Sequence, residues 1–68
     1  MTVLKLRSGG KRLTFTVRPA EDFDRYSWTV CRADGSVESC GFFFRSLDAA
    51  IKNAASFFDD LPLWYCEG

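Results

Sequence analysis

The chain has 68 residues, and nine lysine and arginine side chains balance nine aspartate and glutamate side chains, so the formal net charge is zero. This length suits one domain with one small core, and the balanced charge argues against a general nucleic-acid binder that relies on phosphate neutralisation. Histidine is absent, which excludes histidine-based catalytic triads, histidine general bases and most common zinc sites.

The first part of the chain alternates apolar and polar residues with the period of a β-strand. Leucines alternate with lysine and arginine over residues 2–7, and apolar residues alternate with threonines over 13–18. The glycine pair at 9–10 suits a tight reversal between the two runs. The sequence therefore predicts a β-hairpin over residues 2–18, followed by an acidic connecting loop that begins at Pro19.

A second hairpin is predicted over residues 25–44. Asp34-Gly35 is a strong turn dipeptide, and the runs on both sides of it are rich in residues that favour strands. If these two residues alone form the loop, counting outward from it places Trp28 opposite Gly41. A large ring opposite a glycine is a favourable cross-strand arrangement.

Three consecutive phenylalanines at 42–44 cannot all face one core, because successive residues of a strand point to opposite sides of the sheet. The same register places Phe43 in the core, opposite Tyr26, and places Phe42 and Phe44 on the other face. A chain of this size has little left to cover that second face, so these two rings are candidates for a contact surface.

The three cysteines are odd in number and lack the paired spacing of a zinc site. In the predicted register Cys31 lies opposite Glu38 and Cys40 lies opposite Thr29, which is poor geometry for a disulfide between the two cysteines. We expect Cys31, Cys40 and Cys66 to be reduced thiols that pack as small apolar side chains.

One amphipathic helix follows the second hairpin. Ser46 is a good N-cap, and apolar residues recur at helical spacing from 47 to 58. We expect the helix to end near Phe58, before Pro62. The tail that follows, residues 61–68, is unusually apolar, which leaves two alternatives: it folds back over the second face of the sheet, or that face stays exposed.

Together these elements predict one α+β domain over residues 1–68, with a four-stranded antiparallel sheet of two hairpins and one helix packed on one face, in the order ββββα. The N-terminus lacks the apolar run of a signal peptide, and no segment has the length of a membrane span, so we expect a cytoplasmic protein. The residues predicted to face the helix are Leu13, Phe15, Val17, Trp28, Val30 and Phe43.

Residues 25–58 resemble the small ββα units of the YegP-like family. The matching features are the Asp34-Gly35 turn, the aromatic residue before the cap at Ser46, and the alanine-rich helix start with Ile51. The resemblance implies a fold rather than an activity, and it brings no catalytic residues. In its size and its lack of histidine the chain also looks like the small proteins of phages and mobile elements, including the anti-CRISPR proteins.

The sequence contains no catalytic, cofactor or metal motif, and its aspartate pairs lack the further oxygen ligands of a calcium loop. We therefore predict a non-catalytic protein-binding module, and more specifically an inhibitor of the anti-CRISPR type that sterically blocks a host defence complex. The alternatives are a single-stranded nucleic-acid binder, in which the aromatics stack on bases, and a self-associating structural module. The candidate partner-binding residues are Phe42, Phe44, Arg45, Trp64 and Tyr65, with Asp22, Asp24, Asp59 and Asp60 as an acidic rim.

Overall fold

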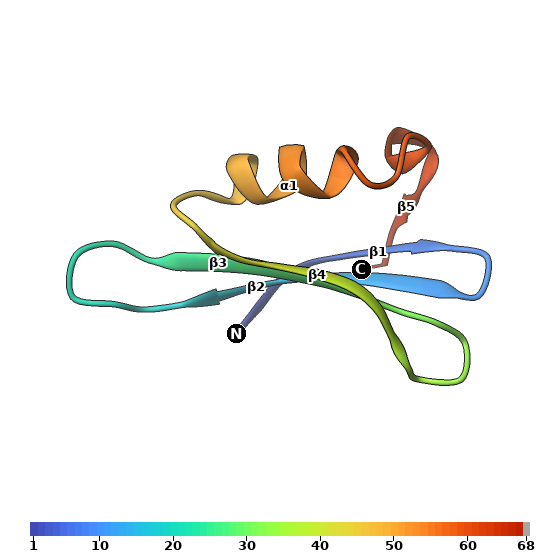
Figure 1. Ribbon diagram of the computed structural model, residues 1–68, viewed down its shortest axis with the longest axis horizontal. Coiled ribbons are helices and arrows are strands. Elements are labelled where there is room, and N and C mark those ends of the chain that lie inside the picture. Colours follow the sequence, from blue (N-terminus) through green and yellow to red (C-terminus); the bar gives the residue numbers. More distant parts are fainter. Residues whose placement is uncertain (68) are drawn as a thin grey trace.

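The computed structural model describes residues 1–67 and shows one antiparallel sheet with a helix packed on one of its faces (Figure 1). This is the predicted α+β class with the predicted order ββββα, and a short fifth strand after the helix extends the predicted four-stranded sheet. Gly68, the last residue of the predicted domain and of the apolar tail, lies outside the described residues. The strands are β1 (Thr2–Ser8), β2 (Lys11–Arg18), β3 (Arg25–Cys31), β4 (Val37–Phe44) and the short β5 (Tyr65–Cys66), arranged across the sheet in the order β4-β3-β2-β1-β5.

The first hairpin, β1 with β2, is confirmed. Gly9 turns the chain with a φ of 59°, a left-handed conformation that glycine adopts without steric cost. The alternating apolar residues of β2, Leu13, Phe15 and Val17, are all buried, and Leu13 and Phe15 share a core with the helix alanines. The sheet therefore has one apolar face, as its alternation predicts.

The turn between β3 and β4 holds three residues instead of the expected two. The amide of Gly35 donates to the carbonyl of Arg32 at 2.9 Å, and the amide of Arg32 donates to the carbonyl of Ser36 at 2.8 Å. Gly35 has a φ of 89°, so the loop is a type I turn closed by a left-handed glycine. Next to it, Cys31 pairs with Val37.

A bulge on β4 at Glu38 takes up this shift. The expected pairing of Cys31 with Glu38 is wrong, because the third turn residue moves the partner by one position. Beyond the bulge the predicted register returns, and Trp28 pairs with Gly41 as expected. The extra loop residue and the bulge thus cancel each other.

A second bulge on β4 changes the positions of the three phenylalanines. Tyr26 pairs with Phe44, so the expected pairing of Tyr26 with Phe43 is wrong, and both Phe42 and Phe43 stand opposite Ser27. Phe43 has a φ of 67° and is 72% exposed, whereas Phe44 is half-buried and packs against the core. The bulge inserts one residue into the alternation, and this exchanges the expected faces of Phe43 and Phe44.

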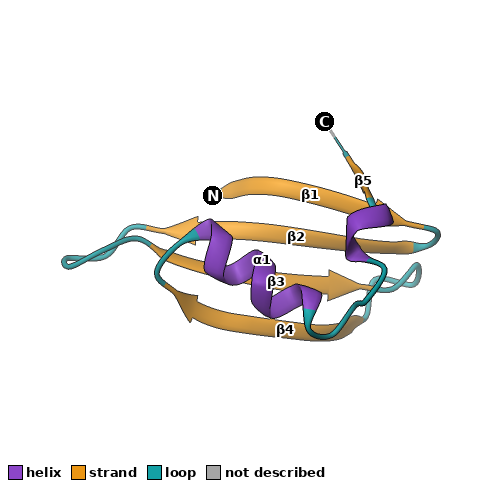
Figure 2. Ribbon diagram, turned by 90° about the horizontal axis from the view of Figure 1, so that it is seen from above, coloured by secondary structure: helices purple, strands orange, loops and turns teal. Residues whose placement is uncertain are grey.

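The helix α1 (Leu47–Ala55) begins at the predicted cap and crosses the sheet obliquely (Figure 2). The side chain of Ser46 accepts a hydrogen bond from the amide of Ala49 at 3.1 Å. Ala50 and Ala54 are fully buried, and their small side chains let the helix approach the sheet closely. The helix ends at Ala55, and the chain continues in a turn to the short 3₁₀ helix η1 (Leu61–Leu63).

The apolar tail docks on the helix side of the sheet. Leu61 and Trp64 are buried in the same core as Phe15 and Trp28, and the rings of Phe58 and Trp64 lie 5.4 Å apart. The tail then descends to the edge of β1, where β5 pairs with it (Figure 1). The expected alternative in which the tail covers the second sheet face is therefore wrong.

Candidate partner-binding surface

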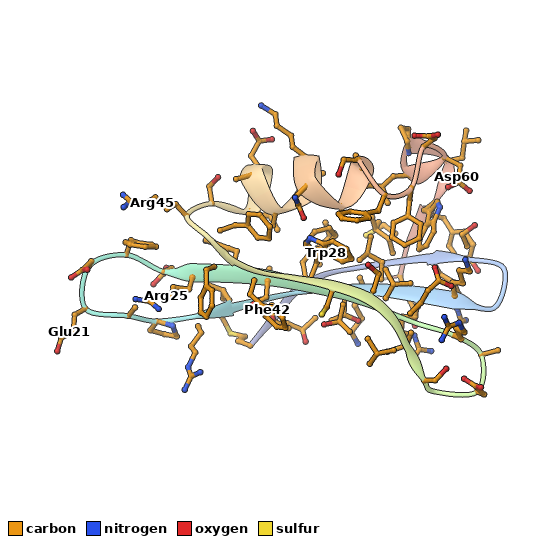
Figure 3. All side chains as sticks on the ribbon, viewed as in Figure 1. Glu21, Arg25, Trp28, Phe42, Arg45 and Asp60 are labelled. Atoms are coloured by element: carbon orange, nitrogen blue, oxygen red, sulfur yellow. The ribbon has the colours of Figure 1, made fainter. Side chains whose placement is uncertain are left out.

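The sheet face opposite α1 carries no covering layer in the described chain, and we call it the open face. Figure 3 shows Phe42 on the side of the sheet away from the helix, whereas Trp28 lies between sheet and helix. The centre of the open face is a ladder of hydroxyl side chains, since strand alternation and pairing bring together Thr14 with Thr29 and Thr16 with Ser27.

Aromatic rings and arginines gather at one end of the sheet, around the β2–β3 loop and the second bulge, where Phe42 and Phe43 are exposed and Phe23 is half-buried. Phe42 is 59% exposed, and its ring centroid lies 6.1 Å from that of Phe43. The guanidinium of Arg25 lies 5.5 Å from the Phe43 ring and 5.7 Å from the Phe23 ring, and that of Arg45 lies 4.4 Å from the Phe23 ring. These distances allow cation–π attraction. The five residues Phe23, Arg25, Phe42, Phe43 and Arg45 form the aromatic–arginine cluster.

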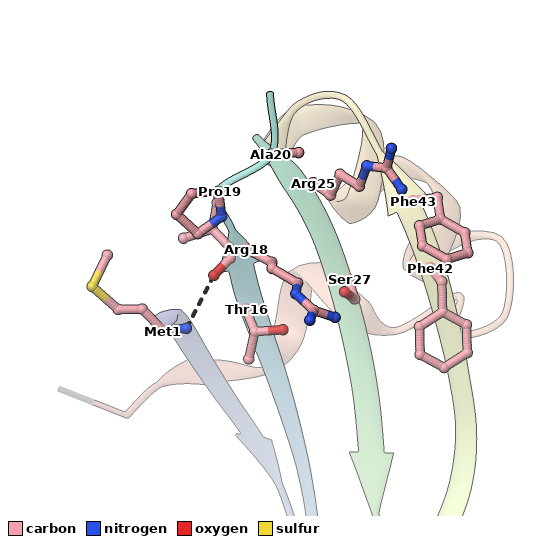
Figure 4. Close-up of a pocket in the computed structure, with 10 residues that line it drawn as sticks. Met1, Thr16, Arg18, Pro19, Ala20, Arg25, Ser27, Phe42 and Phe43 are labelled. Atoms are coloured by element: carbon pink, nitrogen blue, oxygen red, sulfur yellow. Dashed lines mark hydrogen bonds between the residues drawn. The ribbon is translucent and has the colours of Figure 1, made fainter. Parts of the chain in front are cut away.

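A pocket of about 780 Å³ opens beside this cluster, and we call it the end pocket (Figure 4). Its lining includes the hydroxyl residues Thr16 and Ser27, the ring of Phe42, and the arginines Arg18 and Arg25. Arg18 and Arg25 form the last residue pair of β2 and β3 before the loop, and strand alternation places both side chains on the open face. The end pocket therefore combines positive charge with an apolar wall.

The structure separates the aromatic residues that the sequence proposed as one site. Phe42 and Arg45 are exposed members of the cluster. Phe44 faces the core instead of the open face, and Trp64 is only 7% exposed. Tyr65 is 58% exposed but lies on β5, at the far edge of the sheet from Phe42.

The acidic residues proposed as a rim also fall into two groups. Asp22 and Asp24 are exposed in the β2–β3 loop, next to the cluster. Asp59 and Asp60 are exposed before η1, and Figure 3 shows Asp60 at the opposite end of the molecule from Arg45. Only the first pair is placed to border the cluster.

Four residues of this surface were not among the predicted partner-binding residues: Arg18, Phe23, Arg25 and Phe43. Phe43 was assigned to the core by a register that lacked the second bulge. Arg18 was a possible candidate from the sequence, because it ends the first predicted hairpin and the second begins shortly after it. Its cross-strand partner, however, depends on the path of the β2–β3 loop.

No cluster of three or more cysteine, aspartate or glutamate side chains that could hold a metal occurs within residues 1–67. All three cysteines are present as thiols, and Cys40 and Cys66 lie on the two outermost strands of the sheet, too far apart to bond within one molecule. The open face can bind a partner through apolar contact, cation–π attraction and charge.

No helix in the described part of the chain is long and apolar enough to cross a membrane. Comparison with known proteins gave no match to a family, to a curated protein or to a solved structure.

Proposed function

We propose that the protein is a non-catalytic protein-binding module that contacts its partner through the aromatic–arginine cluster. The observation that carries this proposal is Phe43, a large apolar side chain that is 72% exposed on a backbone with a φ of 67°. A bulky residue at positive φ is strained, and glycine would adopt this conformation freely. Strained and exposed residues cluster at functional sites, and Phe43 contributes little to the core.

The composition of the cluster supports contact with a protein. Aromatic residues and arginine are enriched at the centres of protein interfaces, where a few of them supply most of the binding energy. Stacking between Arg25 and two rings also restricts the arginine before a partner arrives, which lowers the entropic cost of association. The exposed rings of Phe42 and Phe43 lie side by side, so a partner can cover both at once.

Affinity capture from a lysate of the host cell, with quantified recovery, tests the proposal. The decisive variant is Phe42→Ser with Phe43→Gly, which removes both exposed rings without opening the core. The matched control is Leu63→Ser, because Leu63 is an apolar residue on η1 that is 84% exposed and lies outside the aromatic–arginine cluster. We expect wild type and control to recover the same partner and the double variant to lose it, with all three folded by circular dichroism. Equal recovery by a folded double variant would contradict the proposal.

The more specific proposal is that the partner is a nucleoprotein defence complex of the host, blocked sterically in the manner of anti-CRISPR proteins. An inhibitor that acts by occlusion needs only a small stable scaffold with one exposed contact surface, which this chain offers. The test is DNA cleavage by a panel of reconstituted RNA-guided complexes with the protein added. We expect inhibition by wild type and none by the double variant. If no complex is inhibited, the specific proposal fails and the general one stands.

A second candidate function is binding of single-stranded nucleic acid. One observation favours it: Lys5, Arg18 and Arg25 share the open face with the exposed ring of Phe42, and stacking rings beside cations are the elements of such sites. A salt-dependent mobility shift with an oligonucleotide would support this candidate. Self-association, the remaining alternative, would appear as a dimeric mass in light scattering.

A further inference from the structure

Arg18 and Arg25 are direct cross-strand partners on β2 and β3. Both are exposed, and both line the end pocket on the open face (Figure 4). Like charges directly opposite each other on adjacent strands destabilise a sheet. Among the ion pairs of residues 1–67, none brings a carboxylate to either guanidinium. The fold therefore holds two positive charges together without an anion of its own.

A second arginine pair on the same face shows how this chain neutralises such an arrangement. Arg7 and Arg12 are cross-strand partners on β1 and β2, at the other end of the open face. One carboxylate oxygen of Glu67, Oε2, lies 3.7 Å from Nε of Arg7 and 3.5 Å from Nε of Arg12. A single glutamate thus serves two arginines, and the Arg18–Arg25 pair has the same strand geometry without the glutamate.

The surroundings of the Arg18–Arg25 pair suit a carboxylate beside an apolar group. The ring of Phe42 lines the same pocket, and Arg25 is steadied by stacking on Phe43. Thr16 and Ser27 add hydroxyl groups that can donate hydrogen bonds to an anion. Charge-assisted hydrogen bonds from guanidinium to carboxylate are stronger than neutral ones, and they fix geometry.

The charges around the pocket favour one carboxylate over a chain of phosphates. Binding a polyanion gains from the neutralisation of many phosphates, whereas the charged residues that line this pocket are two arginines and Met1, whose ammonium group donates to the carbonyl of Val17. The exposed acids Glu21, Asp22 and Asp24 of the adjoining loop would repel a long polyanion. At the other end of the face Arg7 and Arg12 are already paired with Glu67, and Lys5, opposite Thr14, adds one further positive charge.

We propose that Arg18 and Arg25 bind a glutamate or aspartate side chain of the partner protein, and that a neighbouring apolar side chain of the partner packs on Phe42 and Phe43. This inference rests on the proposed protein-binding function and names the chemistry of the partner's contact segment. The arginine pair supplies selectivity for the acid, and the rings supply apolar contact area.

The experiment is an NMR titration of ¹⁵N-labelled protein with a capped peptide in which two glutamates flank a phenylalanine. The observed signals are the side-chain Nε–H groups of Arg18 and Arg25 and the amides of Ser27 and Phe42. Parallel titrations use the same peptide with glutamines and an oligothymidylate of equal charge. The variants are Arg18→Gln and Arg25→Gln, with Arg12→Gln as the matched control from the glutamate-paired end of the same face.

We expect saturable shifts at these four residues with the glutamate peptide, weaker at high salt, and no saturable shift with the glutamine peptide. Arg18→Gln and Arg25→Gln should each reduce affinity at least several-fold, and Arg12→Gln should preserve it. Removing either arginine of the unneutralised pair should leave the melting temperature unchanged or raise it, so a loss of binding is not a loss of folding. Equal shifts with both peptides, shifts centred on Arg7 and Arg12, or tighter binding of oligothymidylate would each overturn the inference.

The titration and the capture experiment test the acidic contact and the protein-binding function separately. If the glutamate peptide leaves Arg18 and Arg25 unchanged while recovery of a partner still depends on Phe42 and Phe43, the acidic contact is wrong and the protein-binding function stands. If the peptide binds but no partner depends on the two rings, the carboxylate site stands and the proposed function is wrong.

Discussion

Gly41 lies directly opposite Trp28 across strands β3 and β4, and the indole ring occupies the space into which a side chain at position 41 would project. A Cβ atom on Gly41 would lie 2.8 Å from Cε2 of Trp28 and even closer to Nε1, and 3.0 Å from Oδ1 of Asn53. Trp28 is fully buried, and its Nε1 donates a hydrogen bond to Oδ1 of Asn53 at 3.0 Å. One aromatic side chain thus joins β3, β4 and α1.

We expect Gly41→Ala to destabilise the fold, because the added methyl group must displace the indole or the helix. Overpacking of this kind costs about 1–3 kcal/mol. Urea unfolding followed by tryptophan fluorescence measures the loss. Gly10→Ala is the matched control, since its added Cβ would meet only the Cβ of Ala33, at 3.1 Å. Equal destabilisation by the two variants would show that the Trp28 contact is not the cause.

The hydrogen bond between Trp28 and Asn53 should be worth a measurable part of the stability. Asn53→Ala leaves the buried indole N–H without its acceptor, which costs about 1–3 kcal/mol. In a Trp28→Phe background the same substitution should cost less, because phenylalanine has no N–H to satisfy. A double-mutant cycle of unfolding free energies measures the difference. Additive effects of the two substitutions would contradict a specific bond between the two side chains.

The register around Trp28 could be predicted from the sequence, although the reasoning missed two irregularities. The loop has one residue more than expected, and the bulge at Glu38 compensates for it, so the Trp28–Gly41 pairing survives. The second bulge has no such compensation. Three identical side chains at 42–44 carry no alternation signal, and nothing in the pattern chooses between registers that differ by one residue.

The candidate site was predictable only in part, because some of its contacts depend on the paths of loops. Phe42 could be placed on the open face because it follows Gly41, whose pairing with Trp28 was predicted from the turn. Which face the tail covers depends on the path of the chain after α1, for which the sequence has no local signal. The Arg18–Arg25 pairing is likewise a tertiary fact, since it depends on how the β2–β3 loop closes.

The β3–β4 turn should contribute a pH-dependent stability at acidic pH. Hydrogen bonds from the hydroxyl and the amide of Ser36, at 2.6 and 2.9 Å, lower the pKa of Asp34 from its usual value of 3.8. Because the pKa of Asp34 is lower in the folded than in the unfolded chain, the stabilisation is complete above the unfolded pKa and is lost as pH falls through the folded pKa.

Asp34→Asn should therefore be less stable than wild type at neutral pH, with a difference that shrinks in strong acid. Ser36→Ala should weaken the pH dependence without abolishing it, because the backbone amide of residue 36 still donates to Asp34. Thermal unfolding across a series of acidic buffers measures both effects. A wild-type advantage that stayed constant down to strong acid would contradict the proposed role of the ionised carboxylate.

Phe43 should be dispensable for folding. Phe43→Gly removes the left-handed strain of a side-chain-bearing residue, about 1–2 kcal/mol, and adds a backbone entropy cost of about 0.5–1 kcal/mol. The ring loses little apolar burial, since it is 72% exposed. We expect the unfolding free energy to stay within about 1 kcal/mol of wild type or to rise. A loss of several kcal/mol would show that Phe43 is held for stability, and it would remove the main support for a binding role.

The tail should prove essential to the fold through Trp64. This side chain is 7% exposed and packs on Phe58, whereas its neighbour Leu63 is 84% exposed. Trp64→Ala should cost about 3–5 kcal/mol by leaving a cavity, which is a large share of the 5–15 kcal/mol that stabilises a typical domain. Leu63→Ala should cost almost nothing, and the two adjacent substitutions form a matched pair in chemical denaturation.

A third variant separates packing from hydrogen bonding at the same position. The indole N–H of Trp64 is buried and has no hydrogen-bond acceptor within the described part of the chain. Trp64→Phe therefore gives up no hydrogen bond and keeps most of the apolar contact with Phe58, so it should cost much less than Trp64→Ala. If alanine at 64 were tolerated as well as alanine at 63, the tail would be an attachment to the core and not a part of it.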